Sequence, residues 1–352
     1  MNSLLPELPA QQGVWERYRS NLPRYCMGVS RYLQAQMMHT LQEELGHTQL
    51  RINYEPFITL IGDEGARLTE LAQWLAISKQ ACNQTVNQME EAGYLERRPD
   101  PQDGRAKRVM LTEKAEVLVR QGARLVGEVE QEFARLIGSG EVAMLSALLS
   151  RLYDGLELPG LRVDALLNTS PRGNLLGLLP RLTDYMMQRL MELNISKGHS
   201  GLKMSYAQVL SLIGPDGGRI QQMARLQEVS KQAIGAIATE LEELGYIARL
   251  SDANDARQVV LQFTDAGWQL LSDSVTSMDE LEAELEAILG TDGLSSFQEL
   301  AGELYHALHI EDEIFETLES SGQVDLKLLA ARLNRQLGKE GAVRLASLLV
   351  SE

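Results

Sequence analysis

The sequence predicts a mainly α-helical protein with small β-hairpins, built from two copies of one domain. Two observations lead to that prediction. Aromatic residues make up only 5% of the 352 residues, while Leu, Ala, Glu, Gln, Met and Arg abound, and such side chains favour helices. Comparison of the chain with itself also reveals a repeat at a fixed shift, the mark of a duplicated domain.

The repeat runs without a gap from about residue 46 to about residue 156. Leu50–Tyr54 pairs with Leu202–Tyr206, so the shift is 202 minus 50, or 152 residues. Further matches at this shift are Ser78–Ala81 with Ser230–Ala233, Gly93-Tyr94 with Gly245-Tyr246, and Leu152-Tyr153 with Leu304-Tyr305. Chance would rarely place so many identities on one diagonal.

The duplication divides the chain into four parts. These are a first repeat at 1–156, a linker at 157–173, a second repeat at 174–310 and a C-terminal helical extension at 311–352. The breaker pairs Pro159-Gly160 and Pro171-Arg172 mark the linker. In the extension, Gly338 separates two amphipathic segments, Asp325–Leu337 and Lys339–Leu349.

Charge and composition exclude several classes of protein. A net charge of -16 argues against a chain that coats nucleic acid, so any DNA contact needs basic residues gathered locally. Met1–Gly13 lacks the pattern of a signal peptide, and no apolar run is long enough to span a membrane. We therefore expect a cytoplasmic protein with no membrane partner.

No motif of an enzyme or a metal site is present in the sequence. Its two cysteines and five histidines lack metal-ligand spacing, and it has neither a phosphate-binding glycine loop nor a nucleophile elbow. We expect no catalytic residues, no cofactor and no metal.

A helix-turn-helix is predicted in the first copy. Apolar residues recur at helical spacing from Leu68 to Leu75, where Thr69 is expected to cap the first turn. Ser78 is expected to cap a second helix over Lys79–Ala92. Its apolar face carries Cys82, Thr85, Val86 and Met89, and its opposite face carries Lys79, Gln80, Asn83, Gln84 and Asn87. Amide side chains suit the reading of adenine in a major groove, although a polar outer face is also the default for any amphipathic helix.

A basic hairpin follows this helix and favours the DNA-reading alternative. Strand-like segments at Tyr94–Arg98 and Arg105–Thr112 flank a turn at Pro99–Gly104. The cations are Arg97, Arg98, Arg105, Lys107 and Arg108, and the anions are Glu96, Asp100 and Asp103, so the local charge is 5 minus 3, or +2. Basic charge is thus gathered where a winged helix would meet DNA.

Leu68–Thr112, with its Asp103-Gly104-Arg105 turn and Leu111-Thr112 exit, resembles the MarR (multiple antibiotic resistance regulator) family. The resemblance covers about 20–156 and, less closely, 172–308. It implies bacterial regulators that act as dimers, with intertwined terminal helices and two recognition helices in successive major grooves. It also implies that Arg105 and Arg257 are wing arginines held by Asp103 and Asp255.

The predicted architecture is therefore two winged helix-turn-helix domains, at about 50–112 and 202–264, on a shared helical platform. The platform would use amphipathic helices such as Arg17–Leu41 and Leu118–Ile137, giving an intramolecular pseudo-dimer. Association of two chains stays open. The predicted partner is double-stranded DNA.

The resemblance further implies a small-molecule effector, an aromatic anion, bound between platform and winged domain to relieve repression. Its expected lining is Met37, Met38, Tyr54 and Phe57 in copy one and Met186, Met187, Tyr206 and Val209 in copy two. Cys26 lies where a peroxide-responsive branch of the family carries its thiol, so a redox role is a hypothesis beside that of a buried apolar residue.

The two copies are expected to read DNA unequally. Gly235 and Ala236 replace Asn83 and Gln84 in the second recognition helix, and the second wing has 2 minus 2, or zero, charge. The contacts predicted for copy two are Ser230, Lys231, Gln232, Arg249, Asp255 and Arg257, alongside Ser78 and the residues named above in copy one. The alternative is a protein that kept the fold, lost DNA binding, and pairs with another regulator or sequesters a ligand.

Overall fold

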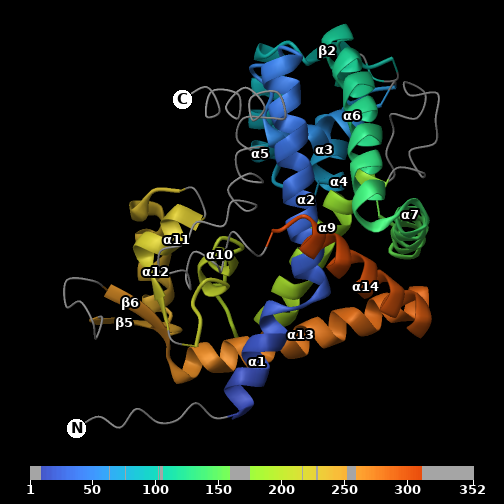
Figure 1. Cartoon of the computed structure of the whole chain (residues 1–352). Coiled ribbons are helices and arrows are strands. Elements are labelled where there is room, and N and C mark those ends of the chain that lie inside the picture. Colours follow the sequence, from blue (N-terminus) through green and yellow to red (C-terminus); the bar gives the residue numbers. More distant parts are fainter. Residues whose placement is uncertain are drawn as a thin grey trace, which may run out of the picture. The chain divides into compact units, whose positions relative to one another are not determined.

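The computed structural model describes residues 9–62, 64–75, 77–101, 103, 106–158, 175–215, 217–226, 229–251 and 259–310 (Figure 1). The predicted C-terminal extension and nearly all of the predicted linker lie outside these residues. Among the helices described, none combines the length and the apolarity that crossing a membrane requires.

The chain divides into two units whose boundaries fall inside helices. Unit 1 comprises Met1–Gly28 and Thr183–Glu352, and unit 2 comprises Val29–Leu182. The boundaries lie within α2 (Leu22–His39) and α9 (Leu175–Ser196). Each unit therefore combines the winged helix of one copy with a helical segment that comes from the other copy.

Copy one is a winged helix followed by two helices. Its elements are α3 (Glu55–Ile61), β1 (Ala66–Arg67), α4 (Leu68–Trp74), α5 (Lys79–Glu91), β2 (Leu95–Pro99), β3 (Lys107–Leu111), α6 (Glu113–Ile137) and α7 (Ser139–Gly155). The strands form an antiparallel sheet in the order β1-β3-β2. The sequence pattern predicted the hairpin but not β1, because a segment of two residues is too short to show the alternation of a strand.

Copy two repeats this order of elements. They are α10 (Tyr206–Leu210), β4 (Gly218–Arg219), α11 (Ile220–Leu226), α12 (Lys231–Glu243), β5 (Ile247–Ser251), β6 (Val259–Phe263), α13 (Asp265–Leu289) and α14 (Thr291–Ala307). Strand register is also repeated, since Arg97 pairs with Val109 and Arg249 with Leu261. Both differences, 249 minus 97 and 261 minus 109, equal the 152-residue shift. The chain is a tandem duplication in fold as well as in sequence.

In each copy, a buried histidine connects the winged helix to the chain before it and to the helix after it. His47 Nδ1 lies 3.0 Å from the Tyr94 hydroxyl and Nε2 lies 2.7 Å from Gln121 Oε1. In copy two, His199 Nδ1 lies 3.0 Å from the Tyr246 hydroxyl, while Nε2 lies 2.9 Å from Asp273 Oδ2. These histidines therefore satisfy buried polar groups and connect the loop before the winged helix to the helix that follows it.

The single helix predicted over Arg17–Leu41 is wrong in its start and continuity. Two helices occupy the region, α1 (Pro9–Arg19) and α2, and a π-helical turn follows at Thr40–Glu44. The break lies at Asn21, whose Oδ1 accepts a 2.9 Å hydrogen bond from the Arg24 backbone N–H. Asn21 thereby caps a new helix, and Pro23 fits its first turn, where no backbone donor is needed.

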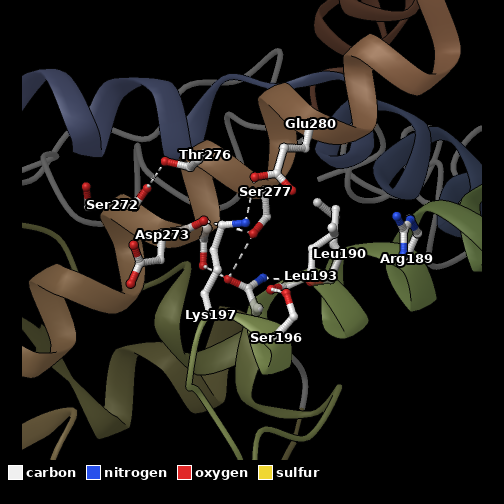
Figure 2. Close-up of polar contacts among 12 residues, drawn as sticks. Arg189, Leu190, Leu193, Ser196, Lys197, Ser272, Asp273, Thr276, Ser277 and Glu280 are labelled. Atoms are coloured by element: carbon white, nitrogen blue, oxygen red, sulfur yellow. Dashed lines mark hydrogen bonds and ion pairs between the residues drawn. The ribbon is translucent and has the colours of Figure 1, made fainter.

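A polar seam joins α9 to α13 within unit 1 (Figure 2). Asn194 is buried; its Nδ2 donates to the Leu190 carbonyl at 2.8 Å, and its Oδ1 accepts from Ser274 Oγ at 3.1 Å. At the rim of the seam, Lys197 Nζ lies 2.7 Å from Glu280 Oε1. The buried groups hold each other in place, because an unsatisfied hydroxyl or amide is costly in an apolar interior.

Replacing Asn194 by alanine is expected to lower the free energy of unfolding by about 1–3 kcal/mol, because Ser274 loses its buried acceptor. Urea denaturation of the full chain measures the change. Gln42→Ala is the matched control, since Gln42 occupies the equivalent position in copy one and donates only to the Leu50 carbonyl from a half-buried side chain. Equal losses in the two variants would contradict the role given to the seam.

Candidate nucleic-acid interface

Helix α5 has the two faces that the sequence predicted. Ser78 Oγ accepts the Ala81 backbone N–H at 3.1 Å, so the predicted cap is confirmed. Cys82, Val86 and Met89 are fully buried against the core of copy one. The opposite face is exposed at all of its predicted positions: Lys79, Gln80, Asn83, Gln84 and Asn87.

The predicted cap of the preceding helix is wrong. Thr69 lies inside α4, which begins at Leu68. The carboxylate of Glu70, the third residue of α4, accepts the Arg67 backbone N–H at 2.7 Å. It thereby gives a hydrogen-bond partner to the backbone donor of the residue that precedes the helix.

Helix α12 repeats the framework of α5 but keeps only one of the four amides on the exposed face, Gln232. Ser230 Oγ accepts the Ala233 N–H at 3.1 Å, and Ile234, Ala238 and Leu241 are buried. Lys231 and Gln232 are exposed, as are Ala236 and Thr239, and Gly235 is half-buried. The outer face of α12 therefore offers fewer groups that can hydrogen-bond to a base than the face of α5 does.

Arg97 is turned toward α5. Its Nη2 donates to Asn87 Oδ1 at 2.6 Å and to Asn83 Oδ1 at 3.2 Å, and its Nη1 binds the Glu90 carboxylate. Arg249 is equivalent in copy two, where it donates to Glu242 Oε2 at 2.8 Å, to Thr239 Oγ1 at 2.9 Å and to the Gly235 carbonyl at 3.1 Å. Both arginines were predicted as DNA contacts, and in the structure Arg97 bonds to α5 and Arg249 bonds to α12.

The base of the first wing is held by a buried carboxylate. Asp100 Oδ2 lies 2.6 Å from Arg67 Nε and 3.9 Å from Arg108 Nη1. Arg108 also donates to the Gly65 carbonyl at 2.8 Å. This residue, predicted as a DNA contact, therefore bonds to the base of the wing. The pair of Arg67 and Asp100 was not predicted from the sequence, although the 152-residue shift matches these residues with Arg219 and Asp252.

Asp100→Ala is expected to lower the free energy of unfolding by about 2–3 kcal/mol, because the removal of a buried carboxylate leaves the Arg67 and Arg108 guanidiniums without their shared partner. The estimate lies below that for a fully buried pair because the arginines are partly exposed. Thermal denaturation measures the loss. The control is Asp103→Ala, an exposed residue of the same hairpin, for which a change under about 0.5 kcal/mol is expected.

The exposed surface of the wing differs in chemistry between the copies. In copy one, Lys107 is exposed, and the Arg98 side chain is 62% exposed beside Glu96. Their counterparts in copy two are Val259, 42% exposed, and Leu250, 47% exposed. These two equivalent positions of the hairpin are thus cationic in copy one and apolar in copy two.

The wing tips are only partly described. Asp103 accepts the Ala106 N–H through its carbonyl at 2.8 Å, which forms the hairpin turn. Arg105, Asp255 and Arg257 lie outside the described residues, so their predicted roles stay predictions.

Several of the remaining candidate positions lie in the packed interior. Cys26 is buried, and burial raises its thiol pKa to about 12, which disfavours the thiolate that a redox sensor needs. Of the predicted effector lining, Tyr54 and Phe57 belong to the core of copy one, and Tyr206 and Val209 belong to that of copy two. In the described part of the chain, no three His, Cys, Asp or Glu side chains are grouped to hold a metal ion.

Two segments of the chain match the MarR family model, residues 57–106 and 200–258. Their ends differ by 258 minus 106, or 152, which is the repeat shift. One segment in each copy is therefore similar to the MarR family.

Three solved structures are similar to parts of the chain. CouR from Rhodococcus jostii RHA1, bound to p-coumaroyl-CoA, is 23% identical over 30% of this chain and 74% of its own, with a TM-score of 0.27. A MarR-family transcriptional regulator from Rhodococcus sp. RHA1 is 18% identical over 37% and 91%, with a TM-score of 0.30. A mutant of MepR from S. aureus, bound to an oligodeoxyribonucleotide, is 18% identical over 37% and 95%, with a TM-score of 0.27.

Proposed function

We propose that this chain is a sequence-specific DNA-binding transcription regulator, a repressor that acts as a single-chain pseudo-dimer. Segments of its two winged helices match the MarR family. One observation carries the proposal. The exposed face of α5 gathers four amides and Lys79, and the adjoining hairpin exposes Arg98 and Lys107 within a chain of net charge -16. Amides suit base edges and cations suit phosphates, so one surface combines both kinds of contact.

The exchange of helical segments between copies supports the pseudo-dimer. In unit 1, Arg17 of α1 binds Asp279 at 3.0 Å and Glu282 at 2.8 Å, both on α13 of copy two. In unit 2, Arg181 of α9 donates to Thr59 Oγ1 on α3 of copy one. A reciprocal exchange of this kind is the single-chain counterpart of a dimer with intertwined terminal helices.

We include in the proposal a small-molecule effector, an aromatic anion that relieves repression. The family resemblance supports it. If such an anion prefers the DNA-free state, linkage requires it to weaken DNA binding by the same factor by which DNA weakens the anion's binding. Titration of salicylate into the protein–DNA complex, followed by fluorescence anisotropy, tests this part separately.

A second candidate function has one observation in its favour. Leu250 and Val259 expose an apolar surface on the second hairpin, where copy one is cationic. Exposed apolar side chains on a β-hairpin suit contact with another protein better than contact with phosphates. The candidate is a regulator-like protein that pairs with another protein and has lost DNA binding.

DNA binding at two salt concentrations separates the two functions. We expect the chain to bind DNA from its own promoter region with an affinity that falls steeply as salt rises, because each neutralised phosphate releases counterions. We expect Lys107→Gln to reduce the salt slope by about 1. The matched change in copy two, Val259→Gln, should leave the slope unchanged. An absence of DNA binding at low salt would favour the second candidate.

A further inference from the structure

We propose that Arg97 is a positioning residue that sets the base preference of copy one by fixing the orientation of the Asn83 and Asn87 side chains. This inference rests on the proposed DNA binding. It concerns the edge of the base pair that the two amides can read.

The two asparagines and the arginine form one bonded group. Asn83 and Asn87 are four residues apart and therefore neighbours on the exposed face of α5. One guanidinium nitrogen of Arg97 bonds to both, at 3.2 Å to Asn83 Oδ1 and 2.6 Å to Asn87 Oδ1. Glu90 binds the other terminal nitrogen and so anchors the guanidinium. The Arg97 side chain is only 19% exposed, which limits its movement.

The chemistry of arginine fixes which end of each amide faces it. A guanidinium only donates hydrogen bonds, so it must meet the amide oxygen and not the amide nitrogen. The oxygen then already accepts from a cation, whose charge also opposes the approach of another donor. Each asparagine is left with its NH2 group, which can only donate, as its principal contact for a base.

This orientation changes the expected readout. A bidentate contact of asparagine with adenine needs the amide oxygen to accept from adenine N6 while the nitrogen donates to N7. A donor alone suits guanine, which presents two acceptors, N7 and O6, and thymine, which presents O4. It suits adenine less well, because the N7 acceptor of adenine stands beside the N6 donor, which then lacks its acceptor. The sequence pattern suggested that the amides read adenine, whereas the bonded group favours guanine or thymine opposite Asn83 and Asn87.

Copy two offers a matched control inside the same chain. Arg249 has the same position and binds Glu242 in the same way, but its other nitrogen bonds to the Gly235 carbonyl and to Thr239 Oγ1. No amide stands at positions 235 and 239, so Arg249 has no asparagine to orient.

Selection from a randomised DNA library by the full chain tests the proposal. We expect the wild type to select guanine or thymine at the positions facing Asn83 and Asn87. We expect Arg97→Met to shift the selection toward adenine by at least about fivefold, because the freed amides can then bind adenine with both atoms. Arg249→Met should leave the selected bases of copy one unchanged. In an Asn83→Ala/Asn87→Ala background, Arg97→Met should produce no shift.

The outcomes distinguish this inference from the proposed function. A wild type that binds the library without any base preference contradicts sequence-specific binding, and the positioning role with it. A wild type that selects a sequence, together with an Arg97→Met variant that selects the same sequence, overturns the positioning role alone. If Arg97→Met fails to fold, Arg97→Leu, which likewise offers no donor to the amide oxygens, takes its place, and the same shift toward adenine is required of it.

Discussion

Trp15→Ala is expected to lower the free energy of unfolding of unit 1 by about 3–5 kcal/mol, although Trp15 precedes the first repeat's winged helix. Its side chain is buried, with its ring centroid 6.1 Å from that of Tyr18 and 6.3 Å from that of Phe263, which ends β6 of copy two. Loss of the indole leaves a cavity where α1 meets the core of unit 1, and the surrounding side chains can close it only in part.

Hydrogen exchange of the full chain locates the effect. Trp15→Ala should speed exchange in α13 of copy two more than in α5 of copy one, since only α13 lies with α1 in unit 1 (Figure 1). The matched control is Trp74→Ala, whose half-buried indole packs on the core of copy one and should affect α5 instead. If Trp15→Ala speeds hydrogen exchange chiefly in copy one, the assignment of α1 to the same unit as the winged helix of copy two is wrong.

The repeated parts of the fold were the parts that sequence could predict. Two copies on one diagonal predicted two winged helices, and strand register repeats at the same shift. The faces of α5 were predicted correctly because a helix of 13 residues shows its 3.6-residue period clearly. Helix starts were less predictable, since they depend on a single hydrogen bond, as at Asn21 and Glu70.

The side-chain partners within the candidate site could not be predicted. Five cations were counted in the first wing, but Arg97 bonds to α5 and Arg108 bonds to the wing base. A count of local charge does not show which way each side chain points. The partners of Arg97 lie 7, 10 and 14 residues away, on a different element. Comparison of the copies offers the missing signal, because Arg97, Glu90, Asp100 and Arg67 all have identical counterparts.

Exchanging the reading residues between copies is expected to change DNA affinity in opposite directions. Asn83→Gly/Gln84→Ala gives copy one the residues of copy two, and we expect it to weaken binding to a selected operator about 10- to 100-fold. The loss of a good base contact costs about 1–3 kcal/mol, which corresponds to that range. Equilibrium titration at fixed salt measures the change, and the salt slope should stay constant because no cation is removed.

The reciprocal change, Gly235→Asn/Ala236→Gln, is the sharper half of the exchange because it predicts a gain. A Cβ atom added at Gly235 meets no other atom within 4 Å, so the backbone of α12 leaves room for a side chain to start there. Replacing a mid-helix glycine should also stabilise α12 slightly. Arg249 stands where Arg97 stands in copy one, so the new asparagine would meet an equivalent guanidinium. We expect binding to an operator with two copy-one half-sites to tighten by at least about fivefold relative to the wild type. An unchanged affinity for such an operator, in a variant that keeps its fold by circular dichroism, would show that the weakness of copy two does not lie in its reading face.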